Sequence, residues 1–327
     1  MSINDVILRN DWHPVAWLAD LQETPIAVEV LGEKVVIFRT SLGIHAFKDL
    51  CIHRGVPLSL GHVKGDELVC AYHGWAYDAC GKCTRIPSMP PTKAIPTKAK
   101  TVTYSCIERY DLIWVCIGEP NQEQPEVGIG KLMNADTVKV KMTPYHLHAA
   151  GPRVIENFLD VSHLMYVHEG LLGDSEYSEI GDYLVQEIGG VLTTDEIDVF
   201  QPDPDGRGYG VHTKYMYEVY RPLSASLTKR SDGTEEYFHL FLFVLPENEQ
   251  QSTAFMIMER NYAYDEPDET FKEFQDRLIE QDREIVENQR PELLPLDLQA
   301  ELHLTCDRLS IAYRKMLKEV GVTFGTE

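Results

Sequence analysis

The chain of 327 residues is long enough for two domains of ordinary size. Hydrophobic residues make up 43% and charged residues 25%, as is typical of a globular protein. Basic residues number 30 against 52 acidic ones, a formal net charge of −22, which argues against nucleic-acid binding because that depends on Lys and Arg contacts to phosphate. Solubility is the simplest explanation of this charge; docking of a basic redox partner or attraction of a cationic substrate are the alternatives.

The chain carries no sign of membrane association or secretion. No apolar run approaches the ~18 residues of a membrane span, and the N-terminus lacks the basic and apolar regions of a signal peptide. Seven cysteines, an odd count, suit a reducing cytoplasm better than a disulfide scaffold. We therefore expect a cytoplasmic protein.

The first part of the chain is rich in short β-branched runs. Residues 26–40 form two such runs around Gly32 and Glu33, which predicts a hairpin. Further strand-like segments occur at 67–70, 102–107 and 111–117. We expect an all-β module.

Two short loops in this module each carry one Cys and one His. Cys51 and His53 form a CxH sequence, and after sixteen intervening residues Cys70 and His73 form CxxH. In a Rieske [2Fe–2S] centre two Cys hold one iron and two His hold the other, so this order predicts a Rieske cluster, with the ligand loops at hairpin tips. The flanking residues, in CIHRGVPL and CAYHGW, resemble the Rieske-domain fingerprint.

A closed Cys₂His₂ zinc site is the alternative for these four residues. Zinc modules usually place two thiols in one loop, whereas here each loop carries a mixed pair. Cys80 and Cys83 form a separate CxxC, for which a redox dithiol or an extra metal ligand is conceivable; ordinary turn cysteines are the simpler interpretation.

The polar, Pro-bounded segment 119–125 predicts a boundary between domains 1–120 and 121–327. The second domain mixes strand and helix patterns, which indicates an α+β fold. Strand-like stretches occur at 184–200, 210–228, 236–246 and 252–263, and helical patterns at 153–167, 268–289 and 300–319.

The segment NFLDVSHLMYVHEG of the second domain holds Asn157, Asp160, His163 and His168. Two His and an acid in so short a stretch suggest a mononuclear metal site. Residues five apart differ by about 140° on a regular helix, so the two His can share one ion only if the helix bends or ends between them. Two unrelated helical histidines are the alternative.

Two His need one carboxylate to complete the facial triad of non-haem Fe(II) oxygenases, and Asp282 is the candidate. At 100° per residue from Phe274, Asp282 falls at roughly 80°, within an apolar arc, and Gln289 is expected on the same buried face. A buried lone charge is costly unless it is paired or binds metal; pairing with an Arg or capping a loop is the alternative. The apolar arc comprises Ile285, Leu278, Phe271, Val286 and Ile279. The acids expected on the opposite face are Asp276, Glu287, Glu280, Glu273 and Glu284.

Together these motifs resemble the oxygenase (alpha) component of Rieske non-haem iron oxygenases over nearly the whole chain. The resemblance rests on CxHRGxPL at 51–58, CxYHGW at 70–75 and NxxDxxHxxxxH at 157–168. Within the family the chain is similar to purine-alkaloid N-demethylases, to aryl O-demethylases such as the dicamba and vanillate enzymes, and to saxitoxin-pathway hydroxylases. The last look most similar, through Gln281-Asp282 and the GVTFG sequence at 321–325.

The resemblance implies an N-terminal Rieske domain and a C-terminal helix-grip catalytic domain, an antiparallel sheet with helices. It implies a [2Fe–2S] cluster, and a mononuclear Fe(II) held by His163, His168 and Asp282. Electrons would come from a reductase or ferredoxin, with NAD(P)H used only through a separate reductase. A head-to-tail homotrimer is implied, in which Asp160 bridges His73 of one subunit and His163 of the next. Asn157 matches a residue near the iron that is usually not a tight ligand.

The function that this resemblance implies is monooxygenation of a small organic substrate, by C–H hydroxylation or by oxidative N- or O-demethylation. Ring cis-dihydroxylation is the alternative within the family. An electron carrier is an alternative of another class, although the first ~118 residues would suffice for one and Asp282 would have no reason to face a core. A zinc-stabilised binding protein is a third.

The substrate pocket is expected between the strands of about 199–260 and the helix carrying His163. Alternation lets only about half of the strand aromatics face it, and such aromatics are more often core residues. The acidic charge favours a cationic, alkaloid-like substrate. The candidate pocket aromatics are Tyr215, Tyr217, Tyr220, Tyr237, Phe241 and Phe243.

Overall fold

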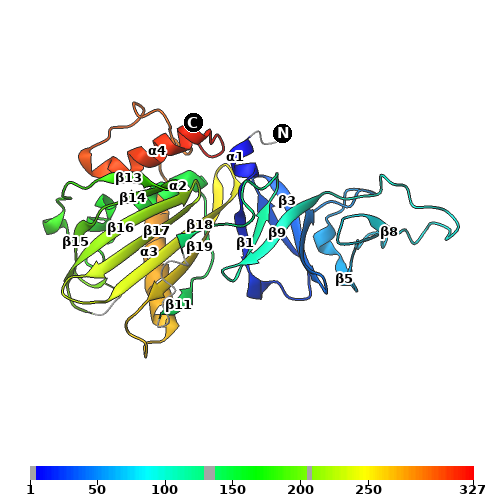
Figure 1. Ribbon diagram of the computed structural model, residues 1–327, viewed down its shortest axis with the longest axis horizontal. Helices are drawn as coiled ribbons and strands as arrows, with labels where there is room; N and C mark the ends of the chain where they lie inside the picture. The colour runs from blue at the N-terminus through cyan, green and yellow to red at the C-terminus, as the bar shows by residue number, and fades with distance from the viewer. Residues whose placement is uncertain (1–4, 129–136, 205–207) are drawn as a thin grey trace. The chain divides into compact units, whose positions relative to one another are not determined.

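The computed structural model describes residues 5–128, 137–204 and 208–327 (Figure 1). The chain divides into two compact units between Pro125 and Glu126. Within the described residues, no helix has both the length and the apolar character to cross a membrane.

The first unit is built on two antiparallel sheets, as expected for an all-β module. The larger has the strand order β1-β10-β9-β4-β3-β2 and the smaller has the order β5-β6-β7-β8. The predicted hairpin at 26–40 is confirmed, and Leu31 and Gly32 turn the chain with φ of 52° and 75°. The elements are α1 Val6–Arg9, β1 His13–Trp17, β2 Ile26–Val30, β3 Glu33–Thr40, β4 Gly43–Lys48, β5 His62–Lys64, β6 Glu67–Val69, β7 Ala76–Tyr77, β8 Cys83–Arg85, β9 Thr103–Arg109 and β10 Leu112–Cys116.

Only one of the two Cys/His loops lies at a hairpin tip. The loop of Cys70 joins the paired strands β6 and β7. The loop of Cys51 instead leads from β4 in the larger sheet toward β5 in the smaller one, because β3 and β9 already occupy both edges of β4. Cys51 and Cys70 are buried in a common core with Phe38, Phe47 and Tyr77.

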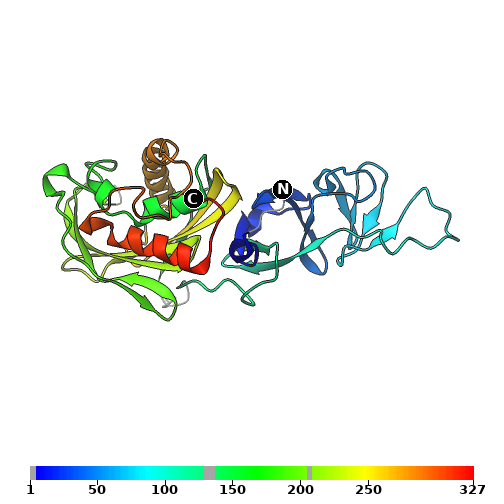
Figure 2. The ribbon, with the colours of Figure 1, turned by 90° about the horizontal axis from the view of Figure 1, so that it is seen from above.

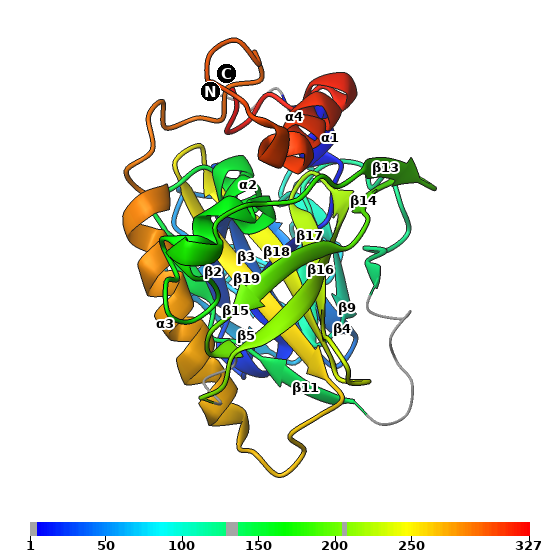
Figure 3. The ribbon, with the colours of Figure 1, turned by 90° about the vertical axis from the view of Figure 1, so that its left-hand side faces the viewer.

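The second unit contains a nine-stranded antiparallel sheet in the order β11-β19-β18-β17-β16-β14-β13, with β12 on β19 and β15 on β16. Helices α2 and α3 lie against one face of this curved sheet (Figures 2 and 3). The strands are β11 Val138–Lys141, β12 Tyr145–Leu147, β13 Val185–Ile188, β14 Val191–Thr194, β15 Ile197–Gln201, β16 Val211–Arg221, β17 Ser224–Ser231, β18 Tyr237–Asn248 and β19 Gln251–Arg260. The helices are α2 Gly151–Leu159, α3 Asp268–Val286 and α4 Arg308–Val320.

The predicted α+β pattern is confirmed, but several bounds were wrong. The stretch at 210–228 is two strands, β16 and β17, that form a hairpin. The helix expected at 153–167 ends at Leu159, and the one expected from 300 begins at Arg308. Strands β11 and β12 were not foreseen because both are short and polar on one side.

A buried ion network joins α2 to α4. Arg314 on α4 is 3% exposed and its Nη2 donates to Glu156 Oε2 on α2 at 2.8 Å. Glu301 accepts from Arg314 and, at 3.1 Å, from Arg153 Nη2. Two of the four residues, Arg153 and Glu156, belong to α2, so the network fixes this helix against the C-terminal part of the unit.

Replacing Arg314 by Ala should lower the free energy of unfolding by about 3–5 kcal/mol, because Glu156 and Glu301 would be left with Arg153 as their one remaining cation and one carboxylate would be uncompensated. Lys272→Ala, which removes an exposed pair with Glu269 on α3, should cost less than about 1 kcal/mol. Urea denaturation of both variants measures the difference. Equal midpoints would show that the buried network contributes no more than a surface pair.

Candidate metal centres

The two Cys/His loops have the same backbone form. In each, the Cys N–H donates to the carbonyl five residues on, Cys51 to Val56 at 2.8 Å and Cys70 to Trp75 at 2.8 Å. In each, a glycine four residues after the Cys, Gly55 or Gly74, has a positive φ and returns a bond to the Cys carbonyl. Positive φ suits glycine, so the CxHxG spacing in one loop and CxxHG in the other are requirements of this turn.

This turn points the two Cys inward and the two His outward. The Cys residues are each 2% exposed, whereas His53 is half-buried and His73 is exposed. The two Nδ1 atoms face each other at 3.1 Å. Two buried thiols and two convergent imidazoles fit a cluster that is ligated by sulfur on one iron and nitrogen on the other.

The seven cysteines are all free thiols. Cys80 is exposed in the turn between β7 and β8, and Cys83 is buried in the core that contains Cys51 and Cys70. The interpretation of Cys80 and Cys83 as ordinary turn cysteines stays a prediction.

The second candidate centre begins where α2 ends. Asp160 follows the helix in an extended conformation, with φ −80° and ψ 120°. Its Oδ1 accepts from Ser162 N at 2.8 Å and Ser162 Oγ at 2.7 Å, and a 3₁₀ turn then runs over Ser162–Met165. The helix therefore ends between Asn157 and His163, which removes the geometric objection to a shared ion.

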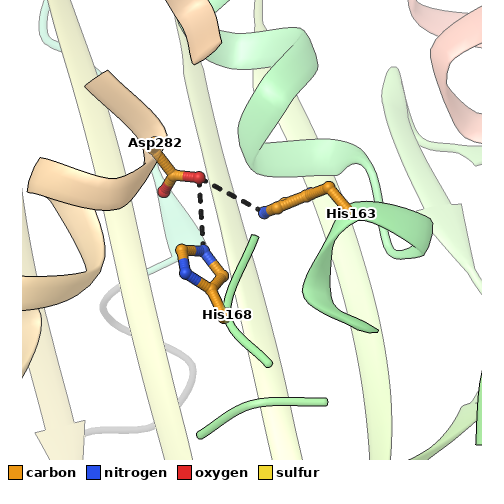
Figure 4. Close-up of side chains that lie close together, drawn as sticks. All are labelled: His163, His168 and Asp282. Carbon is orange, nitrogen blue, oxygen red and sulfur yellow. Dashed lines mark ion pairs between the residues drawn. The ribbon is translucent and has the colours of Figure 1, made fainter. Parts of the chain in front are cut away.

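His163, His168 and Asp282 converge on one point (Figure 4). Asp282 Oδ1 lies 3.5 Å from His163 Nε2 and 3.2 Å from His168 Nε2, and one ligand atom from each residue lies within 4.8 Å of the others. The side chains of His163, His168 and Asp282 are 13%, 2% and 16% exposed.

Hydrogen bonding to His168 indicates what this cluster can hold. Its Nδ1 lies 2.9 Å from Gln281 Oε1, an atom that can only accept, so Nδ1 carries a proton and Nε2 of the neutral imidazole presents a lone pair. This lone pair and the Asp282 carboxylate oxygen at 3.2 Å repel each other unless a metal ion or a proton lies between them. The donor set therefore fits a metal ion with an N₂O ligand set.

Asp160 and Asn157, the other two candidate site residues of this domain, lie beside the His163–His168–Asp282 cluster. Asp160 Oδ2 is 3.7 Å from His163 Nδ1, and Asn157 Nδ2 is 3.5 Å from Asp282 Oδ1. The bond from His168 to Gln281 was not foreseen, although Gln281 adjoins Asp282. No pattern in the sequence distinguishes a glutamine that orients a ligand from one that faces solvent.

The helical angles placed Asp282 correctly, on the face of α3 with Leu278 and Val286. Ile285, expected in the same arc, is 47% exposed. Gln289 was expected on this face too, which is wrong because α3 ends at Val286. Two of the acids expected on the opposite face are not free in solvent: Asp276 accepts from Tyr145 Oη at 2.7 Å, and Glu287 from the N–H of His148 at 3.0 Å.

Two protein families match separate parts of the chain. Residues 11–99 match the family described as Rieske [2Fe-2S] domain, and residues 147–322 match the family described as vanillate O-demethylase oxygenase C-terminal domain.

The chain belongs to the Rieske non-haem iron oxygenases.

Individual relatives of this Rieske oxygenase extend over almost its whole length. It is 30% identical to methylxanthine N1-demethylase NdmA of Pseudomonas putida, over 96% of this chain and 89% of that protein. It is 26% identical to a vanillate O-demethylase oxygenase subunit of a Pseudomonas species, over 95% and 94% of the two chains. The solved structure of Pseudomonas putida CBB5 NdmA with caffeine matches with a TM-score of 0.85 at 30% identity, covering 96% of this chain and 91% of that one.

The expectations of family, fold class and enzyme class are thereby confirmed. The protein is a Rieske-type monooxygenase with a Rieske [2Fe–2S] cluster and a mononuclear non-haem iron, and its electrons come from a separate reductase.

A largely apolar cavity of this oxygenase, about 970 Å³ with open solvent at its mouth included, reaches the His163–His168–Asp282 cluster. Its walls are α2, α3 and the inward residues of β16–β19. Tyr215 and Tyr217 line it, as expected. The other four candidates do not line it: β18 turns its even-numbered residues to the cavity, so Tyr237, Phe241 and Phe243 face away, and on β16 Tyr220 faces away in the same manner.

Proposed function

We propose that Cys51, His53, Cys70 and His73 hold the [2Fe–2S] cluster and that His163, His168 and Asp282 hold the mononuclear iron. The observation that carries the second assignment is the convergence of His163, His168 and Asp282, in which His168 Nε2 lies 3.2 Å from Asp282 Oδ1 while His168 Nδ1 is occupied by Gln281. We also propose that residues 1–120 are the Rieske domain and 121–327 the catalytic domain; the compact units that divide after Pro125 support this.

The reaction that we propose is oxidation of a methyl or other C–H group of a small organic substrate, most simply oxidative N- or O-demethylation. The names of the methylxanthine and vanillate relatives support demethylation. Bound by His163, His168 and Asp282, the mononuclear iron would supply O₂ activation with electrons delivered through a reductase or ferredoxin. The apolar cavity walls would exclude water and hold the methyl group beside His163 and His168.

For the assembly we propose a homotrimer in the cytoplasm. In it Asp160 would connect His163 of one subunit with His73 of the next. The Asp160 side chain is 36% exposed although it adjoins His163, whose side chain is only 13% exposed, so a second protein could reach Asp160. Seven free thiols support a reducing compartment.

A single-turnover experiment tests the reaction. Chemically reduced, iron-replete protein would be exposed to O₂ with N-methyl, O-methyl and guanidinium-bearing compounds, and the products analysed by mass spectrometry. We expect formaldehyde and a demethylated product. A product heavier by one oxygen without formaldehyde would indicate hydroxylation instead, and a product with two added hydroxyls would contradict monooxygenation.

Gln281→Leu should weaken binding of a divalent metal at the mononuclear site about 10- to 100-fold, because His168 would lose the acceptor that fixes its tautomer. Titration of the iron-depleted site with Co²⁺ measures the affinity directly. Gln275→Leu is the matched control on α3, since Gln275 lines the cavity without bonding to a ligand candidate. Equal affinities in the two variants would contradict the orienting role.

Tyr77→Phe should lower the reduction potential of the cluster by about 40 mV. Tyr77 Oη lies 3.2 Å from Cys51 Sγ, and its O–H would stabilise the electron-rich reduced cluster by about 1 kcal/mol more than the oxidised one. Redox titration followed by circular dichroism measures the potential. Tyr72→Phe, at a tyrosine 61% exposed beside His73, should leave it unchanged.

A further inference from the structure

Two buried polar side chains line the cavity without a hydrogen bond of their own. Tyr217 on β16 is 1% exposed and Gln275 on α3 is 6% exposed. Within the described part of the chain, neither the Tyr217 hydroxyl nor the Gln275 side-chain amide has a hydrogen-bond partner. Burying such a group unbonded costs free energy, and a polar group left so in a cavity is free to bond a ligand.

Other polar side chains of the lining are already engaged. Asn157 Nδ2 lies 3.5 Å from Asp282 Oδ1, and the Arg283 guanidinium donates to Glu280 at 2.9 Å. The Tyr215 hydroxyl accepts from the side chain of a buried glutamine. Tyr217 therefore differs from its neighbour on the same strand, whose hydroxyl is used inside the protein.

Tyr217 belongs to a row of side chains that crosses the cavity face of the sheet. The row runs from Tyr217 on β16 through Leu227 and Leu240 to Met258 on β19. Arg260, two residues after Met258, belongs to the next row on the same face. The two rows give a scale along the cavity.

Helix α3 runs antiparallel to β19 along this scale. Near the start of α3, the centre of the Phe271 ring lies 4.0 Å from the Arg260 guanidinium. Near its end, Arg283 donates to the carbonyl of His146, which pairs with Thr253 on β19. Passing along α3 from Phe271 thus leads from the Arg260 row toward the Met258 row.

Gln275 consequently lies at about the level of the Tyr217 row, on the helical wall of the cavity. It follows Phe271 by about one turn, roughly 6 Å along the helix, and successive rows on one face of a strand are roughly 7 Å apart. Asp282 comes about two turns after Gln275, on the same face of α3 and roughly 10 Å further along. The two unbonded groups thus share one level, and the metal cluster lies beyond it.

The chemistry of the two groups defines what they can bind. Burial, with a smaller contribution from Tyr215 and Asp160, raises the pKa of the Tyr217 phenol well above its usual value, so the hydroxyl keeps its proton and can donate it in a hydrogen bond. The Gln275 amide offers both a donor and an acceptor. A ring carbonyl suits the phenol, and an N–H beside a C=O suits the amide.

We propose that Tyr217 and Gln275 together recognise a neutral, planar heterocycle with a lactam or imide edge and hold its N-methyl group at the His163–His168–Asp282 cluster. This inference rests on the proposed function, because it places the oxidised methyl group at that cluster. The Tyr217 hydroxyl donates to one ring carbonyl, and the Gln275 amide pairs with the adjacent N–H and C=O. The distance of roughly 10 Å between Gln275 and Asp282 leaves room for one or two fused rings between their side chains. Both residues are then specificity-determining residues, and the substrate is neutral.

Equilibrium dialysis on the metal-loaded protein tests this recognition without turnover. The probes are N-methyl derivatives of pyrimidinedione and quinazolinedione that keep one ring N–H. Each is compared with the hydrocarbon of the same shape, toluene or methylnaphthalene. Tyr217→Phe and Gln275→Leu should each weaken binding of the better dione about tenfold, because each removes a buried hydrogen bond, and should leave the affinity for the hydrocarbon within about twofold.

Tyr220→Phe is the matched control, because Tyr220 lies on the same strand, bonds to Ser226 Oγ at 2.9 Å and faces away from the cavity. It should leave the affinity for the dione unchanged. Unchanged dione affinity in Tyr217→Phe or in Gln275→Leu, an equal loss of affinity for the hydrocarbon, or diones that do not bind would each overturn the proposal. If a dione binds through both residues but yields no formaldehyde in a turnover, the proposed demethylation fails while the recognition site stands.

Discussion

Replacing Asp160 by Ala is expected to leave both metal centres loaded and to reduce steady-state oxygenation at least about 100-fold. Asp160 Oδ2 is 3.7 Å from His163 Nδ1, on the side of the imidazole opposite to the metal-facing Nε2. If the Asp160 carboxylate connects His163 to the Rieske cluster of a neighbouring subunit, removing this carboxylate breaks the path of electrons but removes no metal ligand. Iron and acid-labile sulfide content, together with the rate of product formation, measure the two effects separately.

Ser162→Ala is the control for local structure around Asp160. It removes the hydroxyl that donates to Asp160 Oδ1 at 2.7 Å but keeps the backbone N–H bond at 2.8 Å and the carboxylate itself. We expect this variant to retain most of its activity. Normal steady-state oxygenation by Asp160→Ala would contradict the bridging role, and loss of iron from it would indicate that Asp160 supports the ligands instead.

Asp282→Ala is expected to lose the mononuclear iron while the Rieske cluster stays. Two imidazoles without a carboxylate leave the ion with an incomplete facial triad. The ratio of iron to acid-labile sulfide should fall from about 1.5 to about 1, with the visible spectrum of the cluster unchanged. Product formation should become undetectable.

Asp276→Ala serves as the matched control on the same helix. The Asp276 carboxylate accepts from Tyr145 Oη at 2.7 Å and does not belong to the His163–His168–Asp282 group, so this variant should keep the full iron content. Retention of all iron by Asp282→Ala would show that the third ligand is another group.

The sequence was sufficient for those parts of the sites that depend on local spacing. The Cys51 and Cys70 loops require a glycine four residues after each Cys, and this requirement is visible as CxHxG and CxxHG. Asp282 could be found because the position of a residue around a regular helix follows from its number alone.

What could not be predicted depends on how helices end and how strands pair. The five-residue spacing of His163 and His168 left two interpretations, and only the bonds from Ser162 to Asp160 show that the helix stops between Asn157 and the first histidine. Tyr217 and Phe241 look alike in the sequence, yet one lines the cavity and the other faces away, because strand alternation fixes the side only once the pairing is known.

The candidate metal ligands His163 and Asp282 lie on helical segments, whereas much of the cavity wall is built from strands. This separation has a consequence for the evolution of new activities. Substitutions at the inward positions of β17 and β19, such as Leu227, Met256 and Met258, change the shape of the cavity without touching the segments that present His163 or Asp282. Unbranched methionines adapt easily to new neighbours, so these positions should tolerate exchange. Mutant libraries confined to these strands should therefore yield a higher proportion of metal-loaded, electron-accepting variants than random mutagenesis of the whole gene.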